Sequence, residues 1–526
     1  ISLCYNSFRM YWADKIAKQI IDSKKFKPYW VDDMKTPSGF AHVGSLRGPI
    51  IHSLIYRALK DAGVDATFTF VINDFDPVKE LSGDFKESFS KYLGFPLMGV
   101  PSPEKGYGSF AEYFTKDFKK NFEDLGVEAR FLSSWDMYHE GKFDGVIREA
   151  LDAAEKIQDI YQKISGSQKR EKGWLPFQNI CEKCGKIGTV RVYAWDGKEV
   201  SYKCEPNMVT WAKGCGHEGK ISPFGGTGKL PWKVDWAAHW KVIGVTIEGA
   251  GKDHASAGGS YDIAMALCKE VFNYPRPFKL PYEFFLIGGR KMSSSKGLGV
   301  KAHDLVKMLP PEIGRFLFTR TDYRQQINFD PMGTMAIPDL FDEYDKCWQA
   351  YIEGSDEDLT RAFVLAQIKT VPEKSSLFLP RFREVAQVIQ MPNTDSKTYF
   401  EEKKGNKLEN KEKEVLEERV KYAKIWLEEY APDEAKFKVA ASERGAKTRG
   451  KLPSEFYQKL IKITESVSSP EELEKKLYIL IKESGFSTKE VFAELYTFLI
   501  NKPYGPKLAW LIWENKEKAL KKLKEK

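Results

Sequence analysis

The segment Pro37-Ser38-Gly39-Phe40-Ala41-His42-Val43-Gly44-Ser45 follows a short run with strand composition at residues 28–33 and starts a helical pattern. Over residues 44–62 the apolar side chains recur at helical spacing, and residues 66–72 form a β-branched and aromatic run typical of a strand. A strand, a glycine-containing turn, a helix and a strand in this order open a doubly wound nucleotide-binding sheet. The segment therefore predicts an α/β fold with a Rossmann-type parallel sheet.

The glycines and the histidine of this segment suit a phosphate site. Unpaired backbone N–H groups and the positive dipole at the first turn of the helix favour phosphate. Gly39 and Gly44 let the backbone approach a nucleotide where a Cβ would block it. His42 can donate a hydrogen bond to a phosphate oxygen whose charge grows during attack by a carboxylate. On its own, the segment is more often a helix start with a surface histidine.

A second segment, Lys291-Met292-Ser293-Ser294-Ser295-Lys296-Gly297, follows an apolar run at residues 284–287 and two glycines. Lysines among small hydroxyl residues on a loop suit a clamp for the β- and γ-phosphates of a nucleotide. The lysine of this segment that contacts phosphate is either Lys291 or Lys296, because the residue between them at the fourth position of the segment is a serine, Ser294. A loop of lysines and serines without function is the alternative for this segment alone.

Two further glycine-rich segments differ in what they predict. Gly251-Lys252-Asp253-His254 follows a strand predicted at residues 242–248, so Asp253 could bind ribose hydroxyls at the carboxyl end of the sheet. The pair Asp253 and His254 could instead cap a helix. Gly225-Gly226-Thr227-Gly228-Lys229-Leu230 imitates a phosphate loop, but it lacks the first glycine at the required spacing and the hydroxyl residue after the lysine. We expect it to be an ordinary loop.

Four of the seven cysteines lie between residues 181 and 215. Such clustering in a large chain points to a metal and not to disulfides. Four protein ligands would make a closed, structural zinc site. The fourth ligand is Cys215 by preference and His217 by exception, and two pairs of free buried cysteines is the alternative without metal. The predicted zinc ligands are Cys181, Cys184, Cys204 and Cys215.

Length and charge limit the remaining possibilities. A chain of 526 residues is too long for one core. The net charge of +8 permits a polyanionic partner without demanding one. No stretch approaches 18 uninterrupted apolar residues, so we expect no membrane span. Residues 1–9 lack the pattern of a secretory signal, and we expect a cytoplasmic protein.

Changes in pattern along the chain predict several segments. Strand signals stop after about residue 310, and helices separated by Pro, Gly and Ser follow. The predicted segments are an upstream stretch outside the fold (1–9), the first half of the catalytic domain (10–109), an insertion with the cysteine cluster (110–220), the second half (221–310), a helical connection (311–350) and a helical domain (351–526).

The two signature segments together, in this order, resemble the HIGH and KMSKS motifs of class I aminoacyl-tRNA synthetases. From about Met10 to its end, the chain is similar to the archaeal-type class I lysyl-tRNA synthetases. The similarity rests on both segments, the cysteine cluster, Thr36-Pro37-Ser38-Gly39, Pro231-Trp232-Lys233-Val234-Asp235-Trp236, Gly251-Lys252-Asp253-His254 and Pro503-Tyr504-Gly505-Pro506.

The resemblance implies a reaction and a division of labour. The enzyme would form lysyl-adenylate from L-lysine and ATP with Mg²⁺, and then charge tRNA-Lys as a monomer that holds one structural Zn²⁺. The helical domain would bind the anticodon. Residues 444–451, with the aromatic Phe456 and Tyr457 after them, are the best local candidate for RNA contact, and a solvated basic loop is the alternative. A second metal site, which many relatives carry, is expected to be absent because residues 104–113 contain neither Cys nor His.

The resemblance also implies three sets of site residues. The catalytic residues would be His42, Gly44, Ser45, Lys291 and Lys296. ATP would be bound by Ser38, Gly39, His42, Gly44, Gly251, Asp253, Lys291, Met292, Ser293, Ser294 and Ser295. Lysine would be bound by Thr36, Ser38, Trp232, Asp235, His254, Tyr282 and Phe284.

The side chain of lysine needs aromatic faces for its stem and a carboxylate for its charge. The sequence does not decide which carboxylate serves, and the candidates are Asp32, Asp33, Asp235 and Asp262. A class I glutamyl- or glutaminyl-tRNA synthetase would need a basic side chain there instead. A synthetase-like binding protein that has lost charging activity is the alternative outside enzymes.

Overall fold

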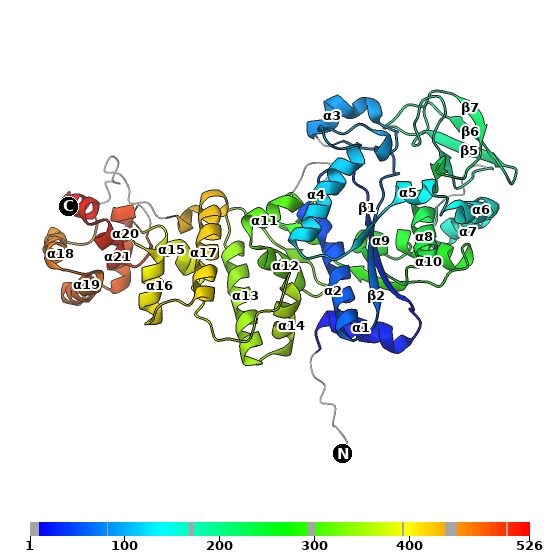
Figure 1. The fold of residues 1–526 in the computed structure, drawn as a ribbon. Helices are drawn as coiled ribbons and strands as arrows, with labels where there is room; N and C mark the ends of the chain where they lie inside the picture. The colour runs from blue at the N-terminus through cyan, green and yellow to red at the C-terminus, as the bar shows by residue number, and fades with distance from the viewer. Residues whose placement is uncertain are drawn as a thin grey trace, which may run out of the picture. The chain divides into compact units, whose positions relative to one another are not determined.

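The computed structural model describes residues 10–81, 83–167, 173–292, 300–391, 394–436, 450–500 and 503–525. The chain forms two compact units (Figure 1). The first consists of the chain up to Phe329 together with Cys347–Glu373, and the second of Asp330–Lys346 together with the chain from Lys374 onward. The predicted upstream stretch, residues 1–9, lies outside the described residues. The other segment bounds stay predictions.

A five-stranded sheet in the order β10-β9-β1-β2-β3 forms the centre of the first unit. All four neighbouring pairs are parallel. The order reverses at β1, because the chain leaves it toward β2 and returns later on its other side as β9. This is the doubly wound topology that the sequence predicts. The strands are β1 (Tyr29–Lys35), β2 (Ala66–Ile72), β3 (Arg130–Ser133), β9 (Ile247–Gly251) and β10 (Phe278–Tyr282).

Helices cover both faces of this sheet. The crossovers β1–α2–β2 and β9–α10–β10 run in opposite directions, so right-handed connections place α2 and α10 on opposite faces. Helix α2 packs against α1 and α12, whereas α10 packs against α7 and α8. The helices of this unit are α1 (Trp12–Ser23), α2 (Arg47–Asp61), α3 (Gly83–Phe89), α4 (Phe110–Asp124), α5 (Ser134–His139), α6 (Asp144–Asp152), α7 (Ala154–Ser165), α8 (Trp232–Ile243), α9 (Lys252–Ala255), α10 (Ser260–Glu270), α11 (Leu305–Met308), α12 (Pro311–Thr319) and α14 (Glu357–Ala366).

Between β3 and β9 the chain forms an additional body of helices α5 to α7 and two small sheets (Figure 1). Strands β5, β6 and β7 pair antiparallel. Strands β4 and β8 pair antiparallel as well. The strands are β4 (Gln178–Asn179), β5 (Val190–Trp195), β6 (Val200–Cys204), β7 (Glu218–Ile221) and β8 (Gly228–Lys229), and a further small sheet holds β11 (Phe285–Ile287), β12 (Arg290–Lys291) and β13 (Ile327–Asn328).

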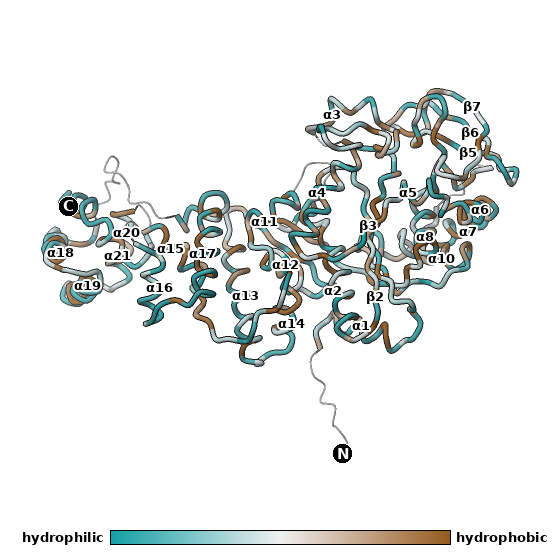
Figure 2. The backbone as a smooth tube through the Cα atoms, in the orientation of Figure 1, coloured by the Kyte–Doolittle hydropathy of each residue, from teal (hydrophilic) through white to brown (hydrophobic). Residues whose placement is uncertain are grey.

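The described residues of the second unit contain helices and no strand, as predicted. Helix α13 (Ala336–Glu353) begins in this unit. Hydrophobic and hydrophilic positions alternate along these helices (Figure 2), as expected for helices with one buried face. The others are α15 (Phe382–Val388), α16 (Ser396–Lys404), α17 (Asn410–Ile425), α18 (Ser454–Ser466), α19 (Pro470–Ser484), α20 (Thr488–Ile500), α21 (Leu508–Glu514) and α22 (Lys516–Leu523).

One RNA-binding expectation for this unit is wrong. Phe456 and Tyr457 are only 3% and 2% exposed, because both rings belong to the hydrophobic core of α18 to α22. They cannot stack on RNA bases while that core is intact. Residues 444–449 of the basic stretch before them lie outside the described residues.

Across the described residues, no helix combines the length and the apolar character needed to cross a membrane.

Candidate active site

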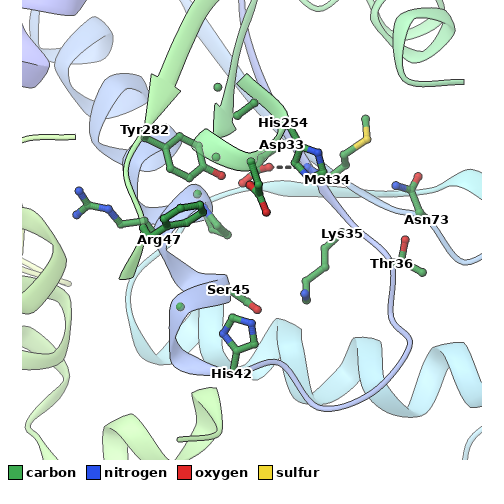
Figure 3. Close-up of a pocket in the computed structure, with 18 of the residues that line it drawn as sticks. Asp33, Met34, Lys35, Thr36, His42, Ser45, Arg47, Asn73, His254 and Tyr282 are labelled. Atoms are coloured by element: carbon green, nitrogen blue, oxygen red, sulfur yellow. Dashed lines mark hydrogen bonds between the residues drawn. The ribbon is translucent and has the colours of Figure 1, made fainter. Parts of the chain in front are cut away.

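A cavity of about 570 Å³ lies at the carboxyl ends of β1, β9 and β10 (Figure 3). Its wall includes the last residues of these strands and the first turn of α2. In an open α/β sheet, ligands bind at this edge, where the strand order reverses. The fold therefore places this cavity where the two sequence motifs predict a nucleotide.

The first motif is held against the chain that follows the second motif. His42 precedes a 3-10 turn, Val43–Leu46, that leads into α2. The backbone N–H of Val43 donates to the carbonyl of Val300 at 2.9 Å, and His42 forms a bridge with Lys301. The two motifs, far apart in sequence, thus meet at one edge of the cavity.

Gly44 of the first motif also packs closely against Met292, near the start of the second motif. A Cβ at Gly44 would lie 2.8 Å from the terminal carbon of Met292 and 3.1 Å from the His42 ring. Only glycine permits this contact without displacing a side chain. The remaining residues of the second motif, Ser293, Ser294, Ser295 and Lys296, lie outside the described residues.

Three basic side chains line one end of the cavity, which we call the cationic end: Lys35, His42 and Lys291. Burial, together with the charges of Lys35 and Lys291, lowers the pKa of His42 to about 4. His42 is therefore neutral at physiological pH and can donate one ring N–H. Its Nδ1 atom is buried and has no hydrogen-bond partner among the described residues. This end suits an anion.

Lys291 already has a carboxylate partner. Its ammonium lies 2.8 Å from Asp253 Oδ2 and 4.5 Å from the centre of the Phe284 ring. Although burial opposes ionisation, the hydrogen bond from Lys291 lowers the pKa of Asp253 below its usual value. Lys291 and Asp253 therefore form an ion pair in the wall of the cavity.

At the other end of the cavity, Asp33 faces a neutral histidine. The Oδ2 atom of Asp33 lies 3.4 Å from Nδ1 of His52. His52 accepts a hydrogen bond from the Gly249 N–H at Nε2, so its proton is on Nδ1, 2.7 Å from the carbonyl of Gly48. This tautomer is uncharged. Although burial opposes it, the charge of Asp33 raises the pKa of His52 above its usual value, so His52 is a partial counter-ion of Asp33.

Two other carboxyls near Asp33 are buried side by side. Asp32 on β1 and Glu248 on β9 are register partners. Glu248 accepts hydrogen bonds from the indole N–H groups of Trp236 and Trp240, and Asp32 accepts one from the Thr69 hydroxyl. Burial is the main reason that the pKa of each carboxyl lies well above its usual value. Glu248 thus orients the indole rings of α8.

The aromatic wall of the cavity starts from that helix. Trp232 and Trp236 are four residues apart, so they lie on one face of α8 and stack at 5.1 Å and 17°. His254 meets Trp232 edge-on at 5.2 Å. Tyr282 and Phe284 line the same cavity. The predicted aromatic residues are therefore brought together.

Asp235 and Asp76 share a buried lysine that the sequence analysis assigned to an ordinary loop. The ammonium of Lys229 lies 2.6 Å from Asp76 and 2.9 Å from Asp235. Burial opposes this charge, but the two carboxylates raise the pKa of Lys229 above its usual value. Thr36 donates to Asp76 at 2.6 Å, and Tyr138 donates to Asp235 at 2.5 Å. The two carboxylates thus share one cation within the protein.

The four clustered cysteines form one group. All four sulfur atoms lie within 4.8 Å of one another. The distance is 3.7 Å for Cys181 to Cys215 and for Cys184 to Cys204. Tetrahedral zinc with Zn–S bonds of about 2.3 Å requires sulfur–sulfur distances of about 3.8 Å. The four thiols therefore fit a zinc ion, and the group includes Cys215 and not His217.

The structure brings most of the predicted residues to the cavity. Gly39 does not line it, and neither does the candidate carboxylate Asp262, which pairs with Lys279 at 2.5 Å. Sequence reasoning missed Lys35 and Glu248, although Asp33 and Lys35 alternate at the end of a strand, which is a usable signal. The predicted residues that line the cavity are Thr36, Ser38, His42, Gly44, Ser45, Trp232, Asp235, Gly251, Asp253, His254, Tyr282, Phe284, Lys291 and Met292.

Comparison with known proteins gives consistent matches. Residues 10–369 match the family model described as tRNA synthetases class I (K). The chain is 32% identical to the lysine–tRNA ligase of Archaeoglobus fulgidus, with 96% of this chain and 97% of that protein covered. It is 33% identical to the lysine–tRNA ligase of Methanocaldococcus jannaschii, with 95% and 96% covered.

We expect Gly48→Ala to disturb the Asp33 end of the cavity. A Cβ at Gly48 would lie 2.6 Å from the Tyr282 hydroxyl and 2.7 Å from Asp33 Oδ2. Such overpacking typically costs about 1–3 kcal/mol. The matched control is Gly145→Ala on α6, whose Cβ would meet nothing within 4 Å. Urea unfolding followed by tryptophan fluorescence should show a lower midpoint for Gly48→Ala only, and equal midpoints would contradict the packing described here.

Proposed function

The chain belongs to the class I lysyl-tRNA synthetase family, and from this premise we propose that it activates L-lysine with ATP and transfers the lysyl group to tRNA-Lys. The observation that carries this proposal is the division of charge in one cavity. Lys35, His42 and Lys291 line its cationic end, whereas Asp33 lines the other end, and aromatic faces lie in the same wall. Lysine bound beside ATP has this distribution of charge.

In the first step, a carboxylate oxygen of lysine attacks the α-phosphorus of ATP, whose phosphates carry Mg²⁺. A carboxyl–phosphate bond forms, the bond to the bridging oxygen breaks, and pyrophosphate leaves with the electron pair. Neutral His42 donates its N–H to an α-phosphate oxygen, where negative charge grows in the transition state. Aimed donors of this kind are usually the largest catalytic contribution.

ATP binding would change the partners of Lys291 and Asp253. Their 2.8 Å ion pair occupies the mouth of the cavity. We propose that Lys291 moves to the phosphates and that Asp253 accepts hydrogen bonds from the ribose hydroxyls. Of the further proposed ATP residues that the structure describes, Ser38, Gly44, Gly251 and Met292 line the cavity, whereas Gly39 does not.

Lysine recognition is proposed to depend on Asp33. Among the candidate carboxylates, Asp235 shares Lys229 with Asp76, and Asp262 pairs with Lys279. Asp32 is fully buried and does not line the cavity. Trp232, Tyr282 and Phe284 would contact the aliphatic stem and attract the ammonium. A glutamyl or glutaminyl specificity would need a cation at this end. Arg47 also lines the cavity, but its guanidinium donates to backbone carbonyls of the segment 318–325.

The second unit is proposed to bind the anticodon arm of the tRNA, because the cavity of the first unit accepts only a small part of that molecule. Its described residues form a helical body with its own hydrophobic core. We also propose a monomer that works in the cytoplasm.

The four cysteines are proposed to hold one structural Zn²⁺, because all four positions of a tetrahedron are filled by the protein. Such an ion would tie the turn at Cys181 and Cys184 to the end of β6 at Cys204. The ion would stiffen the small sheets and would take no part in the reaction.

ATP–pyrophosphate exchange measured with each of the twenty amino acids tests the proposed function. We expect exchange with lysine and charging of purified tRNA-Lys, because the Asp33 end of the cavity complements an ammonium. Exchange with glutamate and not with lysine would replace the proposed specificity. A folded protein that binds ATP but supports neither reaction would be a synthetase-like binding protein.

Asp33→Asn should raise the KM for lysine at least tenfold, because a hydrogen bond to a charged group contributes about 1.5–3 kcal/mol. Competition by norleucine, which lacks the side-chain ammonium of lysine, should be unchanged. The control Asp262→Asn removes a carboxylate that does not line the cavity and should leave the KM for lysine as in the wild type. An equal loss of lysine and norleucine binding in Asp33→Asn would show that Asp33 only shapes the cavity.

Elemental analysis should give one zinc per chain, and Cys204→Ser should lose it. Removing a ligand of a structural zinc weakens the fold around it, so hydrogen exchange should increase in residues 175–220. Cys268→Ser is the matched control, because Cys268 is a buried cysteine on α10 outside the group. Two zinc ions per chain, or none, would refute this site.

A further inference from the structure

Lys35 and Lys79 are the lysines of the cavity wall that have no ion pair with a carboxylate among the described residues, and Lys35 is the one on a strand of the central sheet. It is the last residue of β1 and lines the cavity, and its side chain extends from the strand toward His42 and Ser45 (Figure 3). Lys291 and Lys229 each have a carboxylate within 3 Å. In the described parts of the chain, no carboxylate lies within ion-pairing distance of Lys35, and the centre of the Phe118 ring lies 6.0 Å from its ammonium.

An enclosed ammonium without a carboxylate is costly. Burial lowers the pKa of Lys35 below its usual value, and Asp33 opposes this effect only in part. The charge of Lys35 in turn is the main electrostatic reason, after burial, for the low pKa of His42. The side chains of Lys35 and His42 therefore face the same part of the cavity. An anion bound there would offset the free-energy cost of burying their charged forms.

The register of β1 relates Lys35 to Asp33. Residues two apart on a strand lie on the same face and about 7 Å apart along it. Both side chains line the cavity. One strand thus presents a carboxylate and an ammonium at a separation that suits an extended ligand with a cation at one end and an anion at the other.

We propose that Lys35 is a further catalytic residue, whose ammonium contacts the non-bridging oxygens of the α-phosphate during adenylate formation. This inference rests on the proposed function. The carboxylate oxygen of the amino acid forms its bond to phosphorus as the bond to the pyrophosphate oxygen breaks, and pyrophosphate takes the electron pair. Lys35 keeps its proton throughout and neutralises charge, whereas neutral His42 supplies a directed hydrogen bond.

Single-turnover adenylate formation is the first test, with Lys35→Met, Lys35→Arg and the exposed control Lys18→Met on α1. Loss of one such contact lowers the rate by about 10²–10³. We expect this loss in Lys35→Met, a substantial recovery in Lys35→Arg, unchanged lysine affinity in both, and wild-type behaviour in the control. A merely structural role predicts the reverse order, because methionine is easier to bury than arginine. A wild-type rate in Lys35→Met would overturn the proposal.

Binding of AMP and adenosine, measured by calorimetry, isolates the α-phosphate and does not depend on the amino acid. Lys35→Met should bind AMP about tenfold or more weakly, as expected for loss of a charged hydrogen bond, and should bind adenosine as the wild type does. Unchanged AMP binding, or an equal loss for both ligands, would overturn the proposal. If the wild type activates no amino acid, the proposed function fails, and this comparison still decides the role of Lys35.

Discussion

The central position of β1 in a parallel sheet is the constraint on which the site depends. Its neighbours are β2 on one side and β9 on the other, so the crossover helices diverge where β1 ends. A cavity forms there because neither helix covers that edge. The end of β1 therefore supplies Asp33 and Lys35 directly, and the next turn supplies His42. A shift of one residue in this strand would turn both charged side chains to the other face.

Charge compensation divides the titratable groups around the cavity into two classes. Lys229 pairs with both Asp76 and Asp235 inside the protein, and the raised pKa of Asp32 and Glu248 favours their uncharged forms. Each of these groups has a hydrogen-bond partner within the protein, although Oδ2 of Asp32 has none among the described residues. Lys35 has no such counter-ion among the described residues, and Asp33 has only the His52 ring at 3.4 Å; this difference in compensation is the physical reason for the proposed ligand contacts.

The cysteine group is joined to the cavity by a short path of backbone. Cys181 follows β4, which pairs with β8, and β8 carries Lys229. Gly228 makes this pairing possible, because a Cβ there would lie 2.3 Å from the carbonyl oxygen of Gln178. A metal that stiffens the turn at Cys181 would thus also hold Lys229 against Asp235. The proposed structural zinc would support the amino-acid end of the site without touching it.

The sequence alone determined the parallel sheet, the helical second unit, the cysteine group and most residues of the cavity, because each depends on local pattern or on a short motif. It could not identify the partner of Lys229, which contacts Asp76 across 153 residues, and it assigned that lysine to an ordinary loop. It also offered Phe456 and Tyr457 to RNA, whereas packing buries both. Which charges have a partner and which rings are covered depends on contacts between distant segments, so only the tertiary structure could show which carboxylates and ammonium groups around the cavity pair with one another.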